Sequence, residues 1–322
     1  MGQPPIPPTP SSLSLTGKTV VITGGNSGLG FEAARQFLHL GVSRLILGCR
    51  SPTKASAAVS ALKADPAVQK LNPNAVIETI ELDLDDYESG LRFSRQIKRD
   101  VAELDILLNN AGIGTMTFEK GKSGHERTMQ VNCYTHILIC LELFPLLQST
   151  AVLRGHPTRI TFVGSAIHLS QTTLQKVPLT DGVLRHLDQN FDRFRRYGDS
   201  KLAVSAYVRR LARVAPSEVV VNNLCPGMVQ TPFDRDMPFV LRTIMGVVRK
   251  AWGRTVEEGA RTLIYASAVA GADTNGKYLQ HNEVHPGAVC LNGTAGDDFV
   301  EQLWKETVED VAHVDPELKR FG

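Results

Sequence analysis

The feature of this sequence that most restricts its fold is a regular alternation of short apolar runs with longer helical segments. The apolar runs are rich in β-branched residues, as buried strands are, and we expect strands at 19–23, 44–48, 76–80, 106–108, 159–163 and 219–221. Helical periodicity between them predicts helices at 28–40, 52–64, 86–102, 125–148 and 198–214. Strands that alternate with helices form a parallel sheet covered on both faces. The sequence therefore predicts a doubly wound α/β fold.

The length of 322 residues fits a single domain of this kind, and no internal repeat or interdomain linker interrupts the pattern. Residues 1–14 are rich in Pro, Ser and Thr, and we expect a disordered lead-in there, followed by the domain at 15–322. The net charge of +2 at pH 7 argues against a nucleic-acid partner or an anionic membrane surface.

The five cysteines and nine histidines show no metal-binding spacing, so we expect no metal. A scattered, odd set of cysteines is typical of reduced thiols, which favours a cytoplasmic protein. The N-terminus lacks the basic and apolar regions of a signal peptide. No apolar run approaches the roughly 18 residues of a membrane span, so none is expected.

A glycine-rich turn, Thr-Gly-Gly-Asn-Ser-Gly-Leu-Gly at 23–30, follows the first expected strand and leads directly into a helix. Glycines there allow the backbone to approach a pyrophosphate, and the helix N-terminus offers it unpaired N–H groups, as in a Rossmann fold. The residues expected to bind a dinucleotide are Gly24, Asn26, Ser27, Gly28, Leu29 and Gly30. An ordinary strand-to-helix turn is the alternative for such a string.

Arg50 stands at the end of the second expected strand, with Lys54 one helical turn further on. Dinucleotide-binding proteins place an acid here to hold the ribose of NAD, or an Arg to accept the 2′-phosphate of NADP. A guanidinium pairs bidentately with a phosphate. Arg50 and Lys54 therefore favour NADP(H), and the alternative is that Arg50 is a solvated surface charge.

Further motifs follow in chain order: Asn109-Asn110-Ala111-Gly112 and Ser165 after strands, Tyr197-x-x-x-Lys201 on a helix, and Pro226-Gly227 after the sixth strand. With the glycine turn, this set resembles the short-chain dehydrogenase/reductase family over nearly the whole chain from about residue 18 to 279. The Asn-Ser-Gly-Leu-Gly and Cys-Arg variants are similar to its retinol-dehydrogenase-like branch, which prefers NADP(H).

Tyr197 and Lys201 are four residues apart, so both project from one face of a helix. A free phenol has a pKa of about 10, and a nearby ammonium lowers it. We expect Tyr197 to be the catalytic acid/base, with Lys201 lowering its pKa. The resemblance implies that Lys201 also holds the nicotinamide ribose. A half-buried aromatic beside a surface lysine is the alternative.

Two more catalytic residues are expected, Ser165 and Asn132. The Ser165 hydroxyl is placed to donate to the carbonyl oxygen where charge develops, although a serine after a strand is more often a cap or turn residue. Asn132 lies within an expected helix, where propensity disfavours it. It matches the family's asparagine that positions a water in the proton relay.

The resemblance also implies cofactor contacts from residues that follow the carboxyl ends of strands, where ligands of open α/β sheets bind. Near the adenosine these are Asp83, Leu84, Asn110, Ala111 and Gly112. Near the nicotinamide and diphosphate they are Pro226, Gly227, Val229 and Thr231, together with Tyr197 and Lys201.

Two segments depart from the short members of the family. An insertion at about 169–196 carries the basic cluster Arg193, Arg195 and Arg196, which we interpret as solvated rather than as meeting an anionic substrate. The segment at 233–253 stands in the place of the substrate lid, and its apolar content predicts a bulky lipophilic substrate. Packing against the body would leave the same pattern. His168 either lines the substrate pocket or lies on the surface.

These features predict an NADPH-dependent oxidoreductase that interconverts a carbonyl and an alcohol on a lipophilic small molecule, such as a natural-product intermediate. A non-redox isomerase, cyclase or dehydratase on the same scaffold is the alternative, because fold does not determine function. A regulatory nucleotide-binding module is disfavoured, because it needs no proton relay. The resemblance implies a homodimer or a tetramer through the long helices, unless the insertion or the C-terminal extension at 293–322 blocks one of these interfaces.

Overall fold

The computed structural model describes residues 2–170, 172, 174, 177, 179–231 and 239–322. Eight strands form one sheet in the order β3-β2-β1-β4-β5-β6-β7-β8, with β8 antiparallel to β7 and all other neighbours parallel. The strands are β1 (Thr19–Thr23), β2 (Arg44–Cys49), β3 (Val76–Glu81), β4 (Ile106–Asn109), β5 (Thr158–Val163), β6 (Val219–Cys225), β7 (Tyr278–Gln280) and β8 (Glu283–His285). The predicted doubly wound α/β fold is confirmed.

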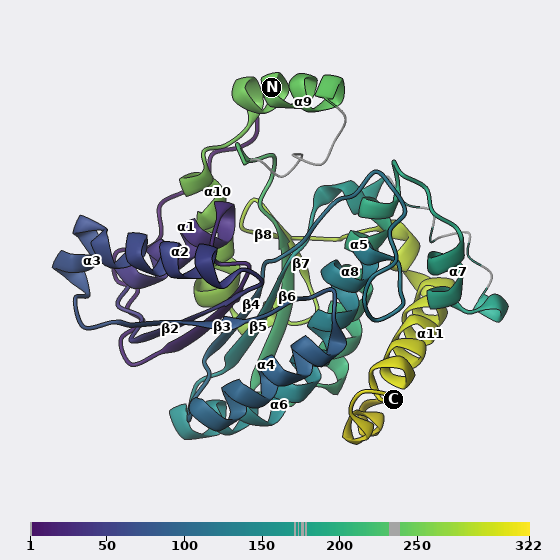
Figure 1. Ribbon diagram of the computed structural model, residues 1–322, viewed down its shortest axis with the longest axis horizontal. Coiled ribbons are helices and arrows are strands. Elements are labelled where there is room, and N and C mark those ends of the chain that lie inside the picture. The colour runs from purple at the N-terminus through teal and green to yellow at the C-terminus, as the bar shows by residue number, and fades with distance from the viewer. Residues whose placement is uncertain (1, 171, 173, 175–176, 178, 232–238) are drawn as a thin grey trace.

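Helices cover both faces of the sheet (Figure 1). On one side lie α1 (Gly28–His39), α2 (Pro52–Ala64), α3 (Pro66–Leu71) and α10 (Val256–Ile264). On the other lie α4 (Tyr87–Asp100), α6 (Thr135–Arg154), α8 (Arg196–Val214) and the C-terminal α11 (Gly293–Val311). In β1, Val20 and Ile22 pack with the α1 and α10 side, whereas Val21 packs with the opposite core. Burial on both faces explains why this strand is apolar throughout rather than alternating.

The predicted long helix at 125–148 is instead a composite. It begins as α5 (Arg127–Met129), widens into a π segment at Gln130–Tyr134, and continues as α6 to Arg154. The span Arg127–Arg154 is the one helix of the described chain long and apolar enough to cross a membrane. Because 67% of its apolar window is buried inside the protein, this helix has the character of a core helix.

The N-terminal segment differs from its expected disorder. Residues 2–10 have no regular secondary structure, but the Ile6 side chain is only 2% exposed. The Ile6 N–H donates to Glu258 of α10 at 2.8 Å, and its carbonyl accepts from Arg261 at 3.2 Å. Arg254 donates to the Pro4 carbonyl at 2.6 Å. Ile6 is therefore buried, and side chains from distant parts of the chain bind the backbone of this segment.

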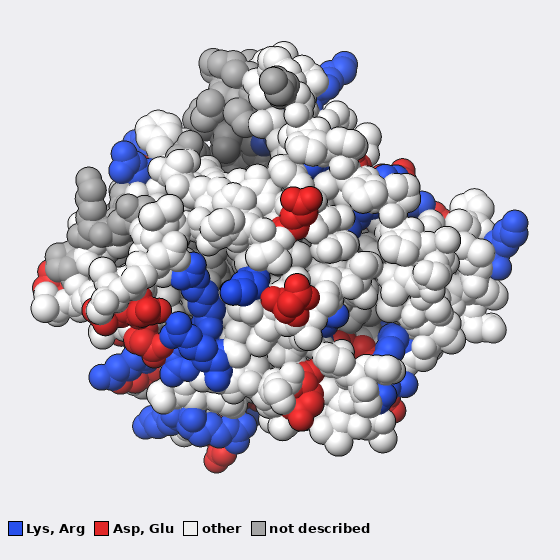
Figure 2. Space-filling view, turned by 180° about the vertical axis from the view of Figure 1, so that it is seen from behind, with Lys and Arg blue, Asp and Glu red and all other residues white. Residues whose placement is uncertain are grey.

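Charged side chains pair across the helical surface instead of forming a uniform patch. Figure 2 shows basic and acidic side chains side by side on the face opposite to the view of Figure 1. Between α8 and α11, Arg210 pairs with Glu301 at 2.8 Å, and Arg213 pairs with both Glu301 and Asp297. The C-terminal extension is thus fastened to α8.

His125 joins the C-terminal helix to the insertion. Its Nδ1 lies 2.8 Å from Asp188, in α7 (Val183–Gln189), and its Nε2 lies 3.0 Å from Asp310 of α11. The Tyr87 hydroxyl also donates to Asp310 at 2.7 Å. Although burial opposes the charged form, the two carboxylates raise the pKa of His125 from 6.5 to about 9.

This shift predicts a loss of stability in alkali. A folded pKa of about 9 against an ordinary value of 6.5 stabilises the native state fully below pH 6.5, and the gain disappears as pH rises through 9. The full stabilisation of the native state by protonated His125 is about 3 kcal/mol. We expect the free energy of unfolding of His125→Gln to fall most below the wild-type value at pH 6 and to converge with it near pH 10, measured by denaturant titration. The exposed His156→Gln is the control, and a pH-independent difference for His125→Gln would contradict the prediction.

Candidate active site

The candidate site lies at the carboxyl edge of the sheet, where β1, β4, β5 and β6 end side by side. The strand order reverses between β1 and β4, and a crevice outside such a switch point is where open α/β sheets bind ligands. The expected glycine turn, Asn110 segment, Ser165 and Pro226-Gly227 all follow these four strands. The structure therefore brings them to one edge.

The glycine turn fits a dinucleotide. Gly24 has a φ of +68°, and a Cβ there would lie 2.9 Å from the Ala111 Cβ. A Cβ on Gly30 would lie 2.4 Å from Asn110 Nδ2, so α1 packs directly against the end of β4. The first turn of α1 contains no acid, and its N-cap residue Ser27 makes no side-chain capping bond. The N–H groups of this turn are therefore available to an anion, with Asn26, Gly28 and Leu29 around them.

Thr23 connects the turn to the Asn110 segment. Its Oγ1 accepts from the Asn110 N–H at 3.0 Å and from the Ala111 N–H at 3.1 Å, and lies 3.0 Å from Nε2 of the buried His136. With two donors on its lone pairs, the hydroxyl donates its own proton to His136 Nε2. His136 then carries its proton on Nδ1, which lies 3.4 Å from the Asn132 carbonyl. Burial lowers the pKa of His136 to about 3, so this link is neutral.

Arg50 and Lys54 are exposed beyond the end of β2, on the open side of the glycine turn. Asp83 follows β3 and is partly exposed beside them, whereas Leu84 is buried in the core and its carbonyl accepts from Thr135. Burial would raise the pKa of Asp83, but its hydrogen bond with Lys122 and the charge of Arg50 bring that pKa below its ordinary value. At this edge Arg50 and Lys122 thus lie near two carboxylates, Asp83 and Asp85.

Tyr197, Lys201 and Ser165 lie together. Tyr197 and Lys201 stand in the first two turns of α8, and the Tyr197 hydroxyl is hydrogen-bonded to Ser165 after β5. The buried Lys201 ammonium donates to the Val163 carbonyl at 2.8 Å and lies 5.5 Å from the centre of the Tyr197 ring. A Cβ on Gly112 would lie 3.5 Å from Lys201 Nζ. The Gly112 backbone thus lies close to Lys201, with no side chain between them.

Burial shifts the pKa values of both Tyr197 and Lys201. Burial raises the pKa of Tyr197 above its ordinary value, and the hydrogen bond with Ser165 only partly opposes this. Burial lowers the pKa of Lys201 to about 8. The Lys201 ammonium is directed at the Val163 carbonyl, and the expectation that it lowers the pKa of Tyr197 stays a prediction. An ordinary phenol is already protonated at neutral pH, so the raised pKa does not by itself make Tyr197 a better proton donor.

Asn132 lies in the π segment, which explains how a residue disfavoured in helices is accommodated. Its side chain accepts from the Ile113 N–H at 2.8 Å and donates to the Ile113 carbonyl at 2.9 Å. It also donates to Ser200 Oγ at 2.9 Å, and Ser200 in turn donates to the Tyr197 carbonyl at 2.8 Å. The structure therefore connects Asn132 to the segment that carries Tyr197.

The loop after β6 carries the remaining expected contacts. Pro226 and Val229 are buried, and Gly227 has a φ of +79°. The Thr231 N–H donates to the Val229 carbonyl at 2.8 Å, and the Thr231 carbonyl accepts from Arg249 at 2.5 Å. A Cβ on Gly28 would lie 3.8 Å from Thr231 Cγ2, so this loop faces the glycine turn.

The two variable segments have different outcomes. Residues 232–238 of the expected lid lie outside the described residues, and α9 (Phe239–Trp252) stands away from the body in Figure 1. Val247 and Trp252 on α9 are exposed. In the insertion, Arg193 and Arg195 are exposed as expected, but the expectation is wrong for Arg196, which is buried. His168 is also buried, with Nδ1 facing the Ser165 carbonyl and its ring 4.7 Å from Tyr278.

Sequence reasoning assigned no role to Thr23, His136, Lys122 or Glu126. One signal was available for His136, because it stands four residues after Asn132 and so shares its helix face. Lys122 and Glu126 had no such signal, since their partners Asp83 and Arg196 lie 39 and 70 residues away.

The chain is similar to known short chain dehydrogenases. Residues 18–177 match the family described as short chain dehydrogenase. The chain is 63% identical over 290 residues to short chain dehydrogenase sor7 of Hypocrea jecorina, covering 89% of this chain and 81% of that protein. It is 40% identical over 314 residues to short chain dehydrogenase macD of Penicillium terrestre, covering 96% and 95%.

Solved structures show the same fold at lower identity. The Pseudomonas aeruginosa RhlG/NADP active-site complex superposes with a TM-score of 0.64 and 24% identity, covering 84% of this chain and 97% of that one. A short-chain type dehydrogenase/reductase from Mycobacterium ulcerans has a TM-score of 0.59 and 18% identity, covering 89% and 92%.

Proposed function

Because this chain belongs to the short-chain dehydrogenase/reductase family, we propose that it is an NADPH-dependent oxidoreductase that interconverts a carbonyl and an alcohol on a lipophilic small molecule. The observation that carries this proposal is the convergence of Ser165, Tyr197 and Lys201 beside the glycine turn, with Asn132 linked to them through Ser200. A module that only binds a nucleotide has no need for such an arrangement.

Ser165, Tyr197 and Lys201 have separate roles in the proposed reaction. When bound, a nicotinamide supplies or accepts the hydride. Ser165 orients the carbonyl oxygen and stabilises its developing charge, and Tyr197 gives that oxygen its proton. The hydrogen bond between the Tyr197 hydroxyl and Ser165 supports this division, because it places the two groups beside each other. Lys201 lies within reach of a ribose placed along Gly112.

Arg50 and Lys54 support the preference for NADPH. Both are exposed cations at the end of β2, and no acid stands between β2 and α2 to bond a free ribose hydroxyl. The nearby Asp83 is already engaged by Lys122 at 2.6 Å. A 2′-phosphate beside Arg50 would gain charge-assisted hydrogen bonds.

Arg50→Ala tests the cofactor preference. We expect the Kd for NADPH to rise roughly 10- to 100-fold, because the variant loses charge-assisted hydrogen bonds worth about 1.5–3 kcal/mol, while the Kd for NADH stays unchanged. Cofactor fluorescence titration measures both constants. Arg99→Ala, at the exposed end of α4 on the opposite edge of the sheet, is the matched control. Equal loss of both cofactors in Arg50→Ala would contradict the NADPH preference.

The apolar residues of α9 support a lipophilic substrate, since Val247 and Trp252 are exposed and the end of α9 is bonded to the loop after β6 through Gln230 and Gly253. A screen of lipophilic ketones and aldehydes by loss of NADPH absorbance tests the reaction. We expect NADPH oxidation with part of this set. Tight NADPH binding without turnover of any carbonyl would instead favour a non-redox enzyme on this scaffold. Failure to bind either nucleotide would overturn the proposal. The five cysteines are scattered along the sequence without a CxxC pair, which also supports a cytoplasmic location.

A further inference from the structure

We propose that Arg196 and Glu126 are positioning residues, whose buried ion pair sets Tyr197 against Asn132 and fastens the insertion to the catalytic helix. The inference deepens the proposed function and rests on it for its kinetic readout. Neither residue is expected to touch substrate or cofactor.

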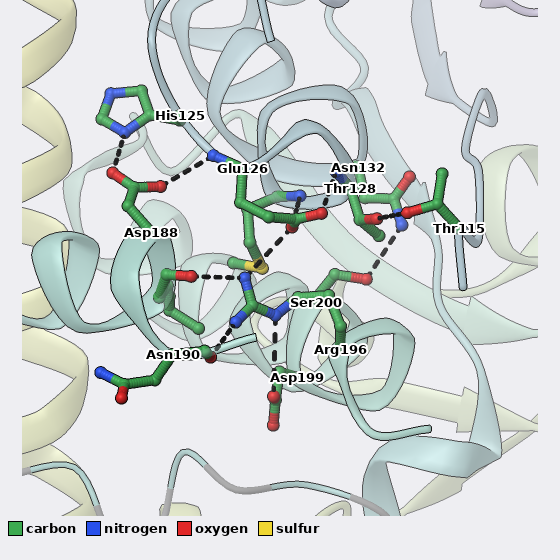
Figure 3. Close-up of polar contacts among 12 residues, drawn as sticks. Thr115, His125, Glu126, Thr128, Asn132, Asp188, Asn190, Arg196, Asp199 and Ser200 are labelled. Carbon is green, nitrogen blue, oxygen red and sulfur yellow. Dashed lines mark hydrogen bonds and ion pairs between the residues drawn. The ribbon is translucent and has the colours of Figure 1, made fainter. Parts of the chain in front are cut away.

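Arg196 directly precedes Tyr197 at the first residue of α8, and its side chain is 1% exposed. Its Nη1 donates to the Leu187 carbonyl at 2.6 Å and to Glu126 at 3.2 Å, and its Nη2 donates to the Asn190 carbonyl at 2.6 Å. Figure 3 shows the guanidinium directed between Asn190 and Glu126. A planar fork that makes several bonds has little freedom to move.

Glu126 belongs to the segment that carries Asn132. Its side chain is fully buried and caps α5, with Oε1 accepting from the Thr128 N–H at 3.0 Å and Oε2 accepting from the Met129 N–H at 3.1 Å. The chain then passes without interruption into the π segment with Asn132. A displacement of Glu126 is therefore transmitted to Asn132 within two helical turns.

The same two segments are tied again at the catalytic end. Asn132 donates to Ser200, and Ser200 donates to the carbonyl of Tyr197. The ion pair thus adds a second attachment on the other side of Tyr197. With one attachment on each side of Tyr197, the first turn of α8 cannot rotate freely. Such a rotation would move the phenol away from Ser165.

The insertion meets the active site through the same guanidinium. Leu187 and Asn190 stand at the C-terminal end of α7, where helix carbonyls lack partners of their own. Arg196 supplies donors and positive charge at this end, which the helix dipole favours. The Phe191 ring lies 5.4 Å from the guanidinium and covers it. The insertion therefore shields the ion pair from water.

Asp199, which is 1% exposed, also lies 4.0 Å from Arg196 Nε (Figure 3). Burial of all these charges points to geometry rather than stability as their contribution. Removing two charges from water is costly, and well-packed apolar residues of similar volume often give equal or greater stability. An ion pair with several directed bonds instead specifies one arrangement of the segments it joins. That arrangement contains both Tyr197 and Asn132.

A double-mutant cycle with Glu126→Gln, Arg196→Met and the combined variant tests the proposal. We expect each single variant to lower kcat roughly 10- to 100-fold, as small displacements of catalytic groups do, with the Kd for NADPH within about twofold of wild type. The combined variant should be no slower than the slower single variant, because one attachment is lost in all three. Arg195→Met, at the neighbouring half-exposed position, should leave kcat unchanged.

A second readout needs no substrate. Hydrogen–deuterium exchange of the backbone at 127–134 should accelerate equally in Glu126→Gln and Arg196→Met, and not in Arg195→Met. If wild type turns over no carbonyl, the proposed function fails but this measurement still decides the positioning role. Unchanged exchange at 127–134, wild-type kcat in folded variants, or a loss of NADPH binding in step with kcat would each overturn the proposal.

Discussion

Tyr197→Phe is expected to lower kcat for carbonyl reduction roughly 10²- to 10⁴-fold, the range that a positioned general acid contributes. The phenol is hydrogen-bonded to Ser165, the residue proposed to orient the substrate oxygen. Phe preserves the ring and its packing beside Lys201. The Kd for NADPH should therefore stay close to the wild-type value.

Stopped-flow NADPH absorbance with an active carbonyl measures this loss. Tyr265→Phe is the matched control, because Tyr265 lies near α10 on the opposite side of the sheet. Turnover retained by Tyr197→Phe would remove Tyr197 from the mechanism. A parallel loss of NADPH binding would mean that the phenol supports the site rather than the proton transfer.

Gly30→Ala is expected to abolish tight cofactor binding. The added Cβ would lie 2.4 Å from Asn110 Nδ2 and 2.6 Å from the Gly24 carbonyl, and the second of these is backbone that cannot turn aside. The added Cβ would push α1 away from the end of β4. The N–H groups of the turn would then lie farther from the diphosphate of the cofactor. Losing one or two such bonds, each about 1.5–3 kcal/mol, raises the Kd for NADPH roughly 100-fold.

The same overpacking should lower the free energy of unfolding by about 1–3 kcal/mol, measured by denaturant titration. Gly246→Ala in α9 is the matched control, because no atom lies within 4 Å of the added Cβ. It should bind NADPH like wild type. Unchanged NADPH affinity in Gly30→Ala would show that the cofactor does not use this turn.

Local sequence patterns were sufficient to predict much of the secondary structure. The predicted strand at 19–23 and the predicted helix at 52–64 coincide with β1 and α2. In β1 every position is buried, and in α2 a proline begins the helix after the capping Ser51. The strands β7 and β8 were not predicted, since each has three residues and their pairing depends on β6 and on each other.

Charge and hydrogen bonding were less predictable from sequence. Arg196 stands in a basic run that resembles a solvated loop, yet Glu126 and two carbonyls of the insertion bury it. The proline-rich N-terminus resembles a free tail, yet α10 binds its backbone at Ile6. Glu126 lies 70 residues from Arg196, and Glu258 lies 252 residues from Ile6. The two carbonyls that bind Arg196 belong to an insertion without a regular pattern.

By itself, the sequence determined which residues reach the carboxyl edge of the sheet. Strand direction and side-chain alternation are local properties, so a motif directly after a strand has a known place once the sheet is parallel. Only the tertiary structure decided where the Lys201 ammonium points, that burial raises the pKa of Tyr197, and that Arg196 is buried. These outcomes depend on desolvation and on partners brought from distant parts of the chain, and neither is encoded in the spacing of neighbouring residues.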